Sequence, residues 1–170
     1  LDHTFGGKIT SCLVNPRACH ETLLLAKPLA QKERIAVVGA GPAGLAFSTE
    51  AAHRGFDVTL IDAANEIGGQ FNVAKQVPGK EEFFETLRYF EKQIERTGVK
   101  LQLGRKVSAQ DLVGGGYKHV VLATGVNPRT PDIEGIGHPK VLGYLDVLRD
   151  KKPVGKTVAL IGAGGIGFDV

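Results

Sequence analysis

Three glycines at fixed spacing lie between an apolar run and a run of helix formers, and they constrain the fold of this chain more than any other feature. They are Gly39, Gly41 and Gly44. The β-branched run at residues 35–38 predicts a short strand before them, and residues 45–54 predict a helix that ends near Gly55. Residues 57–61 predict a second strand, which ends at Asp62. This order predicts a parallel β–α–β unit.

The position of each glycine has a physical reason if the turn binds a dinucleotide. Gly39 permits the tight turn, Gly41 lets the backbone approach a pyrophosphate, and Gly44 lets the helix pack closely on the strand. The helix N-terminus favours an anion there. Asp62 follows where a carboxylate can accept hydrogen bonds from both ribose hydroxyls. The alternative is a plain glycine turn with an aspartate that caps a loop, but the complete order of elements favours a dinucleotide site.

Farther along, the sequence predicts one long helix and two more strands. Apolar residues recur at i, i+3 and i+4 across residues 81–97, and Gly98 ends the run. They are Phe83, Phe84, Leu87, Phe90 and Ile94. Residues 99–103 alternate as a half-buried strand does, and residues 119–123 predict a buried strand. The chain is therefore predicted to have an α/β, Rossmann-like fold with a mainly parallel sheet, ordered 3-2-1 at its core.

Weaker signals predict four smaller features. The turn at residues 114–116 suggests the tip of a hairpin, and so a small antiparallel excursion around residues 101–117. Short helices are predicted at residues 20–26 and near residues 145–149. A further strand is predicted at residues 157–161, directly before a second glycine cluster.

The second glycine cluster repeats the spacing of the first. It comprises Gly162, Gly164 and Gly167. An ordinary glycine turn is the alternative, but the repeat of strand plus glycine spacing favours a second dinucleotide half-site. The residue at the end of the next strand would decide between NADH and NADPH, and the sequence does not contain that strand.

Composition excludes several classes of function. Apolar residues make up 42% and charged residues 23% of the chain, and 21 Lys and Arg against 18 Asp and Glu give a net charge of +3 spread along the sequence. We therefore expect no nucleic-acid partner. No apolar run is long enough to span a bilayer and no signal peptide is recognisable, so no membrane association and a cytoplasmic location are predicted. No Ser/His/Asp or paired-carboxylate constellation occurs, so no catalytic residue is predicted.

The chain contains no methionine, and its second glycine cluster stands close to its last residue. A glycine turn of this kind binds and packs through the helix that follows it. We therefore expect the sequence to be a piece of a longer protein, truncated at both ends.

Three short motifs resemble the two-dinucleotide-binding flavoproteins. They are Gly41-Pro-Ala-Gly44, Ile67-Gly-Gly-Gln70 and Val121-Leu-Ala-Thr-Gly125. In that family the first motif and the second glycine pair bind FAD, and the third lies beside FAD where the chain enters the NAD(P) domain. The resemblance thus implies FAD at the first site and NADPH at the second. The implied cofactor-binding residues are Gly39, Gly41, Pro42, Ala43, Gly44, Asp62, Gly69, Gln70, Lys80, Val107, Thr124, Gly125, Gly162, Gly164 and Gly167.

Cys12 stands in a Cys-x-x-Asn-Pro context that narrows the resemblance. On composition alone, Cys12 and Cys19 are too few for a disulfide framework or a cluster. The whole chain, however, resembles 2,4-dienoyl-CoA reductase of the bacterial iron–sulfur type, and more loosely trimethylamine dehydrogenase. In those proteins three clustered cysteines precede a fourth in this context. Cys12 matches that fourth metal ligand, the sequence lacks the other three, and Cys19 matches none.

The resemblance implies an electron path and three regions. NADPH reduces FAD, a [4Fe–4S] cluster relays single electrons, and FMN in a barrel absent from this sequence reduces an acyl-CoA substrate. Residues 1–30 would be a remnant of the cluster segment, residues 31–140 the FAD domain, and residues 141–170 the start of the NAD(P) domain. A chain cut in this way is expected to bind FAD poorly and to catalyse nothing.

Two other functions remain open on the sequence. One is a dinucleotide-binding docking or regulatory module without turnover, and the other is amine dehydrogenation, as in the trimethylamine dehydrogenase relatives. The intact second glycine cluster counts against the amine dehydrogenase, because those relatives mostly lack a functional NAD(P) site.

Overall fold

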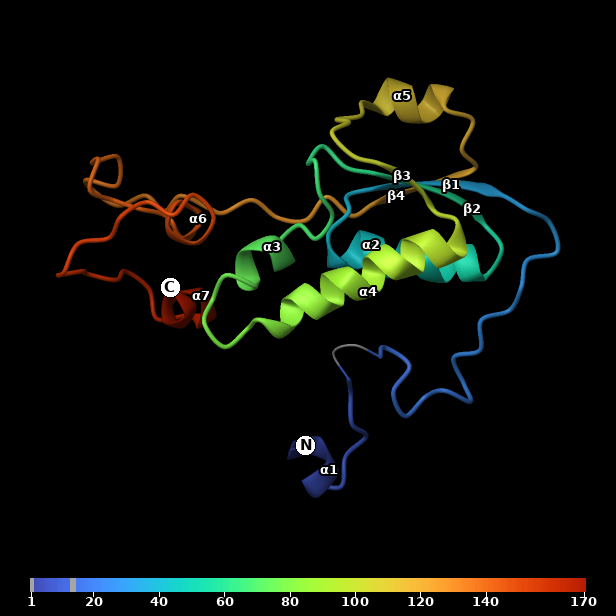
Figure 1. The fold of residues 1–170 in the computed structure, drawn as a ribbon, viewed down its shortest axis with the longest axis horizontal. Coiled ribbons are helices and arrows are strands. Elements are labelled where there is room, and N and C mark those ends of the chain that lie inside the picture. Colours follow the sequence, from blue (N-terminus) through green and yellow to red (C-terminus); the bar gives the residue numbers. More distant parts are fainter. Residues whose placement is uncertain (1, 13–14) are drawn as a thin grey trace.

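A computed structural model describes residues 2–12 and 15–170 of the chain (Figure 1). Its helices are α1 (Asp2–Phe5), α2 (Pro42–His53), α3 (Phe71–Ala74), α4 (Glu82–Thr97), α5 (Ala109–Gly114), α6 (Tyr144–Leu148) and α7 (Gly165–Asp169). Its strands are β1 (Arg34–Val38), β2 (Asp57–Ile61), β3 (Lys100–Gln102) and β4 (His119–Leu122). The order of these elements confirms the predicted α/β class.

The four strands form one parallel sheet in the order β3-β2-β1-β4. Val37 of β1 is opposite Leu60 on one side and Val121 on the other. The predicted 3-2-1 order is confirmed, with β4 added beyond β1. The chain therefore adds strands outward from β1 to β3 and then returns to the other side of β1. The strand order thus reverses between β1 and β4, although all four strands are parallel. Open α/β sheets bind ligands at such a reversal, outside the carboxyl ends of the strands.

Helices α2 and α4 cover the same face of the sheet (Figure 1). The core between them and the strands contains alternate residues of β1 and β2, because successive side chains of a strand point to opposite faces. Its buried members are Ile35, Val37, Ala40, Leu45, Ala51, Val58, Leu60, Ile67, Ile94 and Val99. Burial of each large member stabilises the fold by about 1.5–3 kcal/mol.

Local signals set the ends of both long helices. Pro42 occupies the first turn of α2, where its missing N–H is not needed. Gly98 ends α4 in the left-handed region at φ 72°, and its N–H donates to the carbonyl of Ile94 at 3.1 Å. The predicted helix at residues 81–97 is confirmed, and the one at residues 45–54 begins one turn earlier than expected.

The predicted antiparallel excursion is wrong. Among the described residues every strand pairing is parallel, and α5 occupies the place of the expected hairpin. The hydroxyl of Ser108 accepts from the N–H of Asp111 at 3.2 Å, and the Asp111 carboxylate accepts from the N–H of Ser108 at 2.8 Å. This capping box starts a helix ahead of the glycines, which end it instead of turning a hairpin.

Other local predictions differ from the structure at the edges of the sheet. β4 forms where expected but is largely exposed, because it pairs with β1 alone and Val120 and Leu122 are uncovered. Residues 157–161 form no strand, since no partner strand lies beside them in the described chain. Residues 20–26 form turns in place of a helix. The short helix near residues 145–149 is confirmed as α6.

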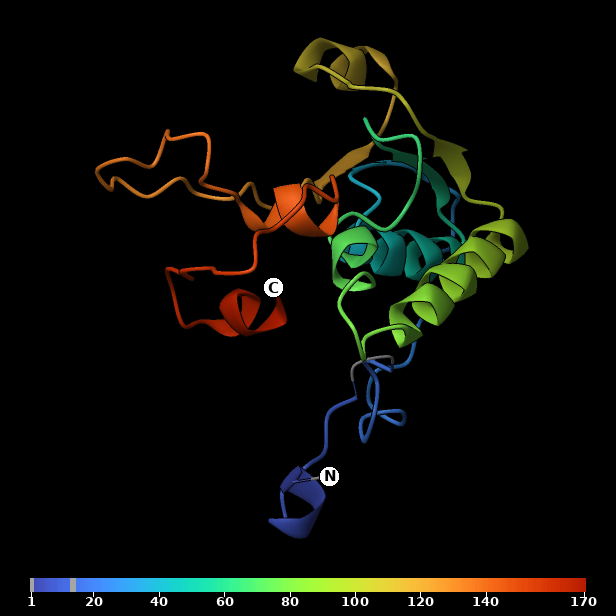
Figure 2. The same ribbon diagram turned by 60° about the vertical axis from the view of Figure 1, so that its left-hand side comes forward.

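The N-terminal segment, including α1, extends away from the sheet and its helices in both views (Figures 1 and 2). Its later part is attached to the end of α2: the N–H of Leu29 donates to the carbonyl of Arg54 at 3.0 Å, and Arg54 Nε donates to the carbonyl of Lys27 at 3.2 Å. In the described part of the chain, no helix has both the length and the apolar character needed to cross a membrane.

Leu60→Ala is expected to lower the free energy of unfolding by about 2–5 kcal/mol, because Leu60 is fully buried in the core. Leu23→Ala is the matched control, since that side chain is 76% exposed, and its effect should stay within about 0.5 kcal/mol. Urea denaturation followed by circular dichroism measures both. Equal stabilities of the two variants would contradict the described core.

Candidate functional site

Three loops meet at the carboxyl ends of the strands, where the strand order reverses. The first follows β1 at residues 39–44, the second follows β2 at residues 62–69, and the third follows β4 at residues 123–125. The N–H of Gly39 donates to the carbonyl of Ile61 at 2.8 Å, and the N–H of Ala123 donates to the carbonyl of Val38 at 2.7 Å. These bonds continue the sheet pairings into the loops, so the three loops form one continuous edge.

Close packing of the main chain explains two glycines of the first loop. A Cβ atom at Gly39 would lie 2.2 Å from the carbonyl oxygen of Ala123, and the φ of Gly39 is +109°. A Cβ atom at Gly44 would lie 1.8 Å from the carbonyl oxygen of Gly39. Neither position can hold a side chain without moving backbone. The roles predicted for these two glycines, a tight turn and close helix–strand packing, agree with this geometry.

Gly41 differs, because nothing in the protein requires a glycine there. Its backbone is extended at φ −77° and ψ −176°, which any residue adopts, and the nearest atom to a Cβ would be 3.9 Å away, at the Cα of Gly69. Gly41 is also the N-cap of α2, and no side chain caps that helix. The first-turn N–H groups of Ala43 and Gly44 therefore lack intrahelical acceptors. A residue without a side chain, beside helix N-terminal donors that lack intrahelical acceptors, is the form of an anion cradle.

A second glycine pair completes this cradle. Gly68 and Gly69 have φ values of +119° and +52°, and a Cβ atom at Gly69 would lie 3.0 Å from the Cα of Gly41. The N–H of Gly68 donates to the carbonyl of Ala40 at 2.8 Å. Asn72, which the sequence analysis missed, holds the loop by donating from its side-chain amide to the carbonyl of Ile67 at 2.8 Å. The two glycine loops thus face each other as bare main chain.

Asp62 links the loop after β1 to the turn after β2. One carboxylate oxygen accepts from the N–H of Ala40 at 2.5 Å, and the other accepts from the N–H of Ala64 at 2.7 Å. The side chain is half-buried, and each carboxylate oxygen has a second lone pair. The carboxylate is therefore fixed in position and can still accept from a hydroxyl group.

The remaining residues predicted for the first site lie at different distances from it. Thr124 and Gly125 follow β4 at the carboxyl end of that strand, where a crevice is expected, and Gln70 follows Gly69 as the N-cap of α3. Val107 lies in the loop whose Arg105 N–H donates to the carbonyl of Asp62 at 2.8 Å. Lys80 lies between α3 and α4 and bonds elsewhere, with its ammonium 2.5 Å from the carboxylate of Asp169. The structure therefore brings most of the set together, with Lys80 engaged by the C-terminal segment.

The second glycine cluster has the backbone geometry of the first. Gly162 has a φ of +113°, Gly164 is the N-cap of α7 at φ −86° and ψ 178°, and a Cβ atom at Gly167 would lie 2.5 Å from the carbonyl oxygen of Gly162. The same three features describe Gly39, Gly41 and Gly44. The second turn, with α7, lies on the side of the molecule where α3 is found (Figure 2).

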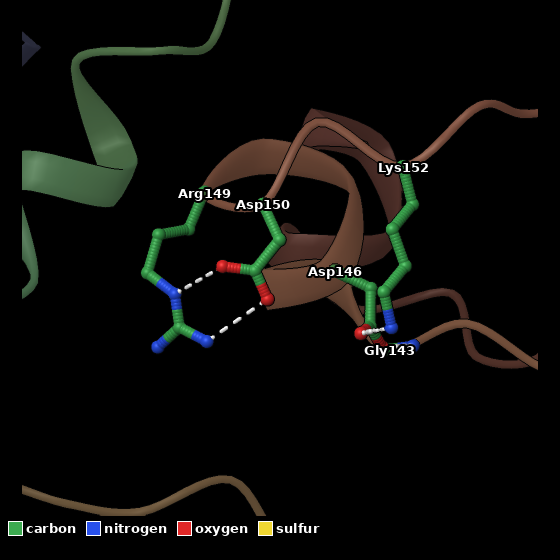
Figure 3. Close-up of polar contacts among 5 residues, drawn as sticks. All are labelled: Gly143, Asp146, Arg149, Asp150 and Lys152. Carbon is green, nitrogen blue, oxygen red and sulfur yellow. Dashed lines mark hydrogen bonds and ion pairs between the residues drawn. The ribbon is translucent and has the colours of Figure 1, made fainter.

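Polar contacts fix the two ends of α6, which leads to this second turn (Figure 3). Asp146 accepts from the N–H of Gly143 at 2.8 Å, and the hydrogen bond from Lys152, followed by the one from Gly143, lowers the pKa of Asp146 below its ordinary value. Arg149 Nε donates to Asp150 at 2.7 Å, and this pair lowers the pKa of Asp150 and raises the pKa of Arg149. These groups are exposed, so they contribute order to α6 more than free energy.

The described residues do not form a metal centre. Cys12 is exposed, and its sulfur accepts from the N–H of Asn15 at 3.4 Å. Within residues 2–12 and 15–170, no three His, Cys, Asp or Glu side chains lie close enough together to hold a metal ion. Leu13 and Val14 of the cysteine motif lie outside the described residues. The described residues alone therefore do not provide the ligands of an iron–sulfur cluster, and the ligand role of Cys12 stays a prediction.

A parallel sheet with a glycine cradle and a fixed carboxylate at its reversal point defines a dinucleotide-binding α/β domain. The comparison with known families gives the particular one. The model of the family described as "Pyridine nucleotide-disulphide oxidoreductase" matches residues 33–170. The chain belongs to this family and has its Rossmann-like FAD/NAD(P)-binding fold.

Three relatives are similar over nearly the whole chain. A metal reductase of Desulforamulus reducens is 36% identical over 99% of this chain and 26% of its own length. A cinnamate reductase of Clostridium sporogenes is 36% identical over 94% of this chain and 24% of its own. The solved structure of a 2-naphthoyl-CoA reductase complexed with 2-naphthoyl-CoA is 35% identical, with a TM-score of 0.91 over 98% of this chain and 26% of that one. The chain spans about a quarter of the length of each relative.

Gly41→Ala and Gly44→Ala should destabilise the ligand-free protein to very different extents. Gly44→Ala is expected to lower the free energy of unfolding by about 3 kcal/mol, because its methyl group meets the Gly39 carbonyl. Gly41→Ala has room for its methyl group and should cost less than about 1 kcal/mol. Urea denaturation of flavin-free samples measures both. A large loss from Gly41→Ala would show that packing, and not a ligand, requires glycine at this position.

Proposed function

We propose that the chain binds FAD in the crevice between β1 and β4 and a nicotinamide dinucleotide at the second glycine cluster. The observation that carries this proposal is the anion cradle at the start of α2, where Gly41 has no side chain and the N–H groups of Ala43 and Gly44 lack intrahelical acceptors. A pyrophosphate fits such a cradle, because main-chain donors and the α2 dipole both favour negative charge. When bound, FAD would supply the hydride-accepting chemistry, and the protein would bind and orient it.

Each part of the crevice has a separate task in this proposal. The N–H groups of Ala43 and Gly44 receive the pyrophosphate, with Pro42 setting the start of the helix, and Asp62 accepts hydrogen bonds from the ribose. Further binding residues proposed from the family resemblance are Gly39, Gly69, Gln70, Thr124, Gly125 and the backbone of Val107. Asp62 suits its task because two N–H groups already hold its carboxylate at the crevice.

The second cluster is proposed as the NADPH half-site through Gly162, Gly164 and Gly167. Its support is the match of its backbone geometry to that of the first loop, together with the family model, which extends to residue 170. The choice of NADPH over NADH depends on the resemblance to dienoyl-CoA reductases.

The whole protein is proposed to be a reductase of the dienoyl-CoA type that acts on a conjugated acyl-CoA. Support comes from two similar proteins whose names give conjugated substrates, a 2-naphthoyl-CoA reductase and a cinnamate reductase. FMN and a [4Fe–4S] cluster would belong to the same whole protein, with Cys12 as one cluster ligand.

Asp62→Ala is expected to weaken FAD retention in the whole protein by about 1.5–3 kcal/mol, because charge-assisted bonds to the ribose are lost. Asp57→Ala is the matched control: this carboxylate lies at the opposite end of β2 and pairs with Lys100 at 2.8 Å. Flavin absorbance after extensive dialysis measures retention. Unchanged flavin content in the Asp62 variant would count against the assignment.

Anaerobic titration of the flavin-loaded whole protein with NADPH separates an oxidoreductase from a docking module. We expect NADPH to bleach the flavin absorbance, because a hydride acceptor beside a nicotinamide site is reduced. A docking or regulatory module would bind NADPH without bleaching. If neither NADPH nor NADH bleached the flavin while an amine did, the amine dehydrogenase alternative would be correct.

A further inference from the structure

The segment from Gly69 to Lys80 contacts both the first glycine loop and the helix after the second glycine cluster, and we refer to it as the bridge segment. Its first residue lies against the first glycine loop, where a Cβ atom at Gly69 would be 3.0 Å from the Cα of Gly41. Its last residue, Lys80, lies 2.5 Å from Asp169 of α7, as measured between the ammonium nitrogen and a carboxylate oxygen. The two glycine clusters are thus connected through about one turn of helix and a short loop.

An apolar contact joins the middle of the bridge segment to the C-terminal part of the chain. Val73 and Val77 are buried against Leu148 of α6, and Tyr144 and Leu145 pack on the same cluster. Both views show α6 and α7 on the side of the molecule where α3 lies (Figures 1 and 2). This contact fixes α6 but lies well before the second glycine turn, because residues 149–161 separate the two and form no helix or strand.

The ion pair between Lys80 and Asp169 acts directly at the second turn. Asp169 lies two positions after Gly167, in the short helix that follows the turn. The two side chains are 37% and 34% exposed, so solvent screens them less than it screens a fully exposed pair. They are 89 positions apart in the sequence, so the contact joins two distant segments of the chain and is not an interaction within one helix.

The backbone of Lys80 is itself held in place. Its N–H donates to the carbonyl of Val77 at 3.1 Å, and its carbonyl accepts from the N–H of Phe83 at 3.2 Å at the start of α4. The rings of Phe71 and Phe83 stack at 4.8 Å and close the loop between α3 and α4. Because the backbone of Lys80 is held in place, its ammonium group can determine the position of Asp169.

We propose that Lys80 and Asp169 are positioning residues that hold the second glycine turn at a set place relative to the FAD crevice. This inference rests on the proposed function, in which that turn receives the nicotinamide dinucleotide. It assigns Lys80 a role different from the FAD contact implied by the family resemblance, because its ammonium is directed at α7. Loss of the pair leaves α6 attached and frees the turn, so nicotinamide binding weakens while FAD binding and the fold persist.

The experiment uses the whole flavin-loaded protein and the variants Lys80→Ala and Asp169→Asn. The KM for NADPH should rise about two- to fivefold in each, as expected for a partly exposed ion pair, with kcat nearly unchanged. Lys80→Arg should restore the wild-type KM, and the charge exchange Lys80→Asp with Asp169→Lys should recover part of it. Lys92→Ala is the matched control, since Lys92 pairs with Glu95 within α4, far from the turn, and should leave the KM unchanged.

Hydrogen exchange of residues 162–170 gives a readout independent of activity. Exchange should be faster in Lys80→Ala than in the wild type, with no change across α2 and β1, and flavin retention should be unaltered. Wild-type KM and wild-type exchange in this variant would overturn the proposal. So would loss of flavin with an unchanged KM, because that result would make Lys80 an FAD contact. If wild-type flavin is not reduced by either nicotinamide, the proposed function fails, and the exchange measurement still decides the positioning role.

Discussion

The carbonyl oxygen of Ala123 lies where a side chain at position 39 would have to be, and much of the structure depends on that contact. It sets how close β4 comes to β1, and the closeness puts the loops after both strands on one edge of the sheet. A second close backbone contact occurs in the first turn of α2. There the absence of a side chain at Gly44 lets the helix pack against the carbonyl of Gly39 at the end of the strand. Sheet, helix and crevice are therefore positioned by main-chain contacts that only glycine permits.

The parts of the fold that local signals determine could be predicted from the sequence. The spacing of Leu87 and Ile94 and the stop at Gly98 determine α4 without reference to the rest of the chain. Features that depend on distant partners could not be predicted in this way. The exposure of β4 reflects its edge position, and residues 157–161 have strand-forming side chains but no neighbour to pair with. The helix α5 was predictable in principle, because the Ser108–Asp111 capping box is local, but the glycines after it were given more weight.

In the candidate site, too, features with a local sequence signal could be predicted, and contacts between distant residues could not. The first glycine motif and Asp62 could be predicted because each follows a strand at fixed spacing, and the other two motifs could be predicted from the family resemblance. Their interactions with the protein were not predictable, since the N–H groups of Ala40 and Ala64 reach Asp62 only in the folded chain. Lys80 and Asp169 carry no local signal of their pairing. The second glycine turn nevertheless adopts the geometry of the first without a preceding strand, so that geometry is encoded in the turn itself.

The crevice is lined by bare backbone where its two glycine loops face each other, and this has a consequence for how such a site can change over time. A glycine can only be replaced by a residue that carries more atoms, and a Cβ atom at Gly69 would lie 3.0 Å from the Cα of Gly41, so replacement there disturbs how the two loops meet. The site cannot be retuned there by small steps, as a pocket lined with side chains can. Variation is confined to the periphery, at positions such as Asp62, Gln70 and Val107. Divergence among proteins built on this crevice should therefore alter what lies around the bound dinucleotide while the cradle itself stays the same.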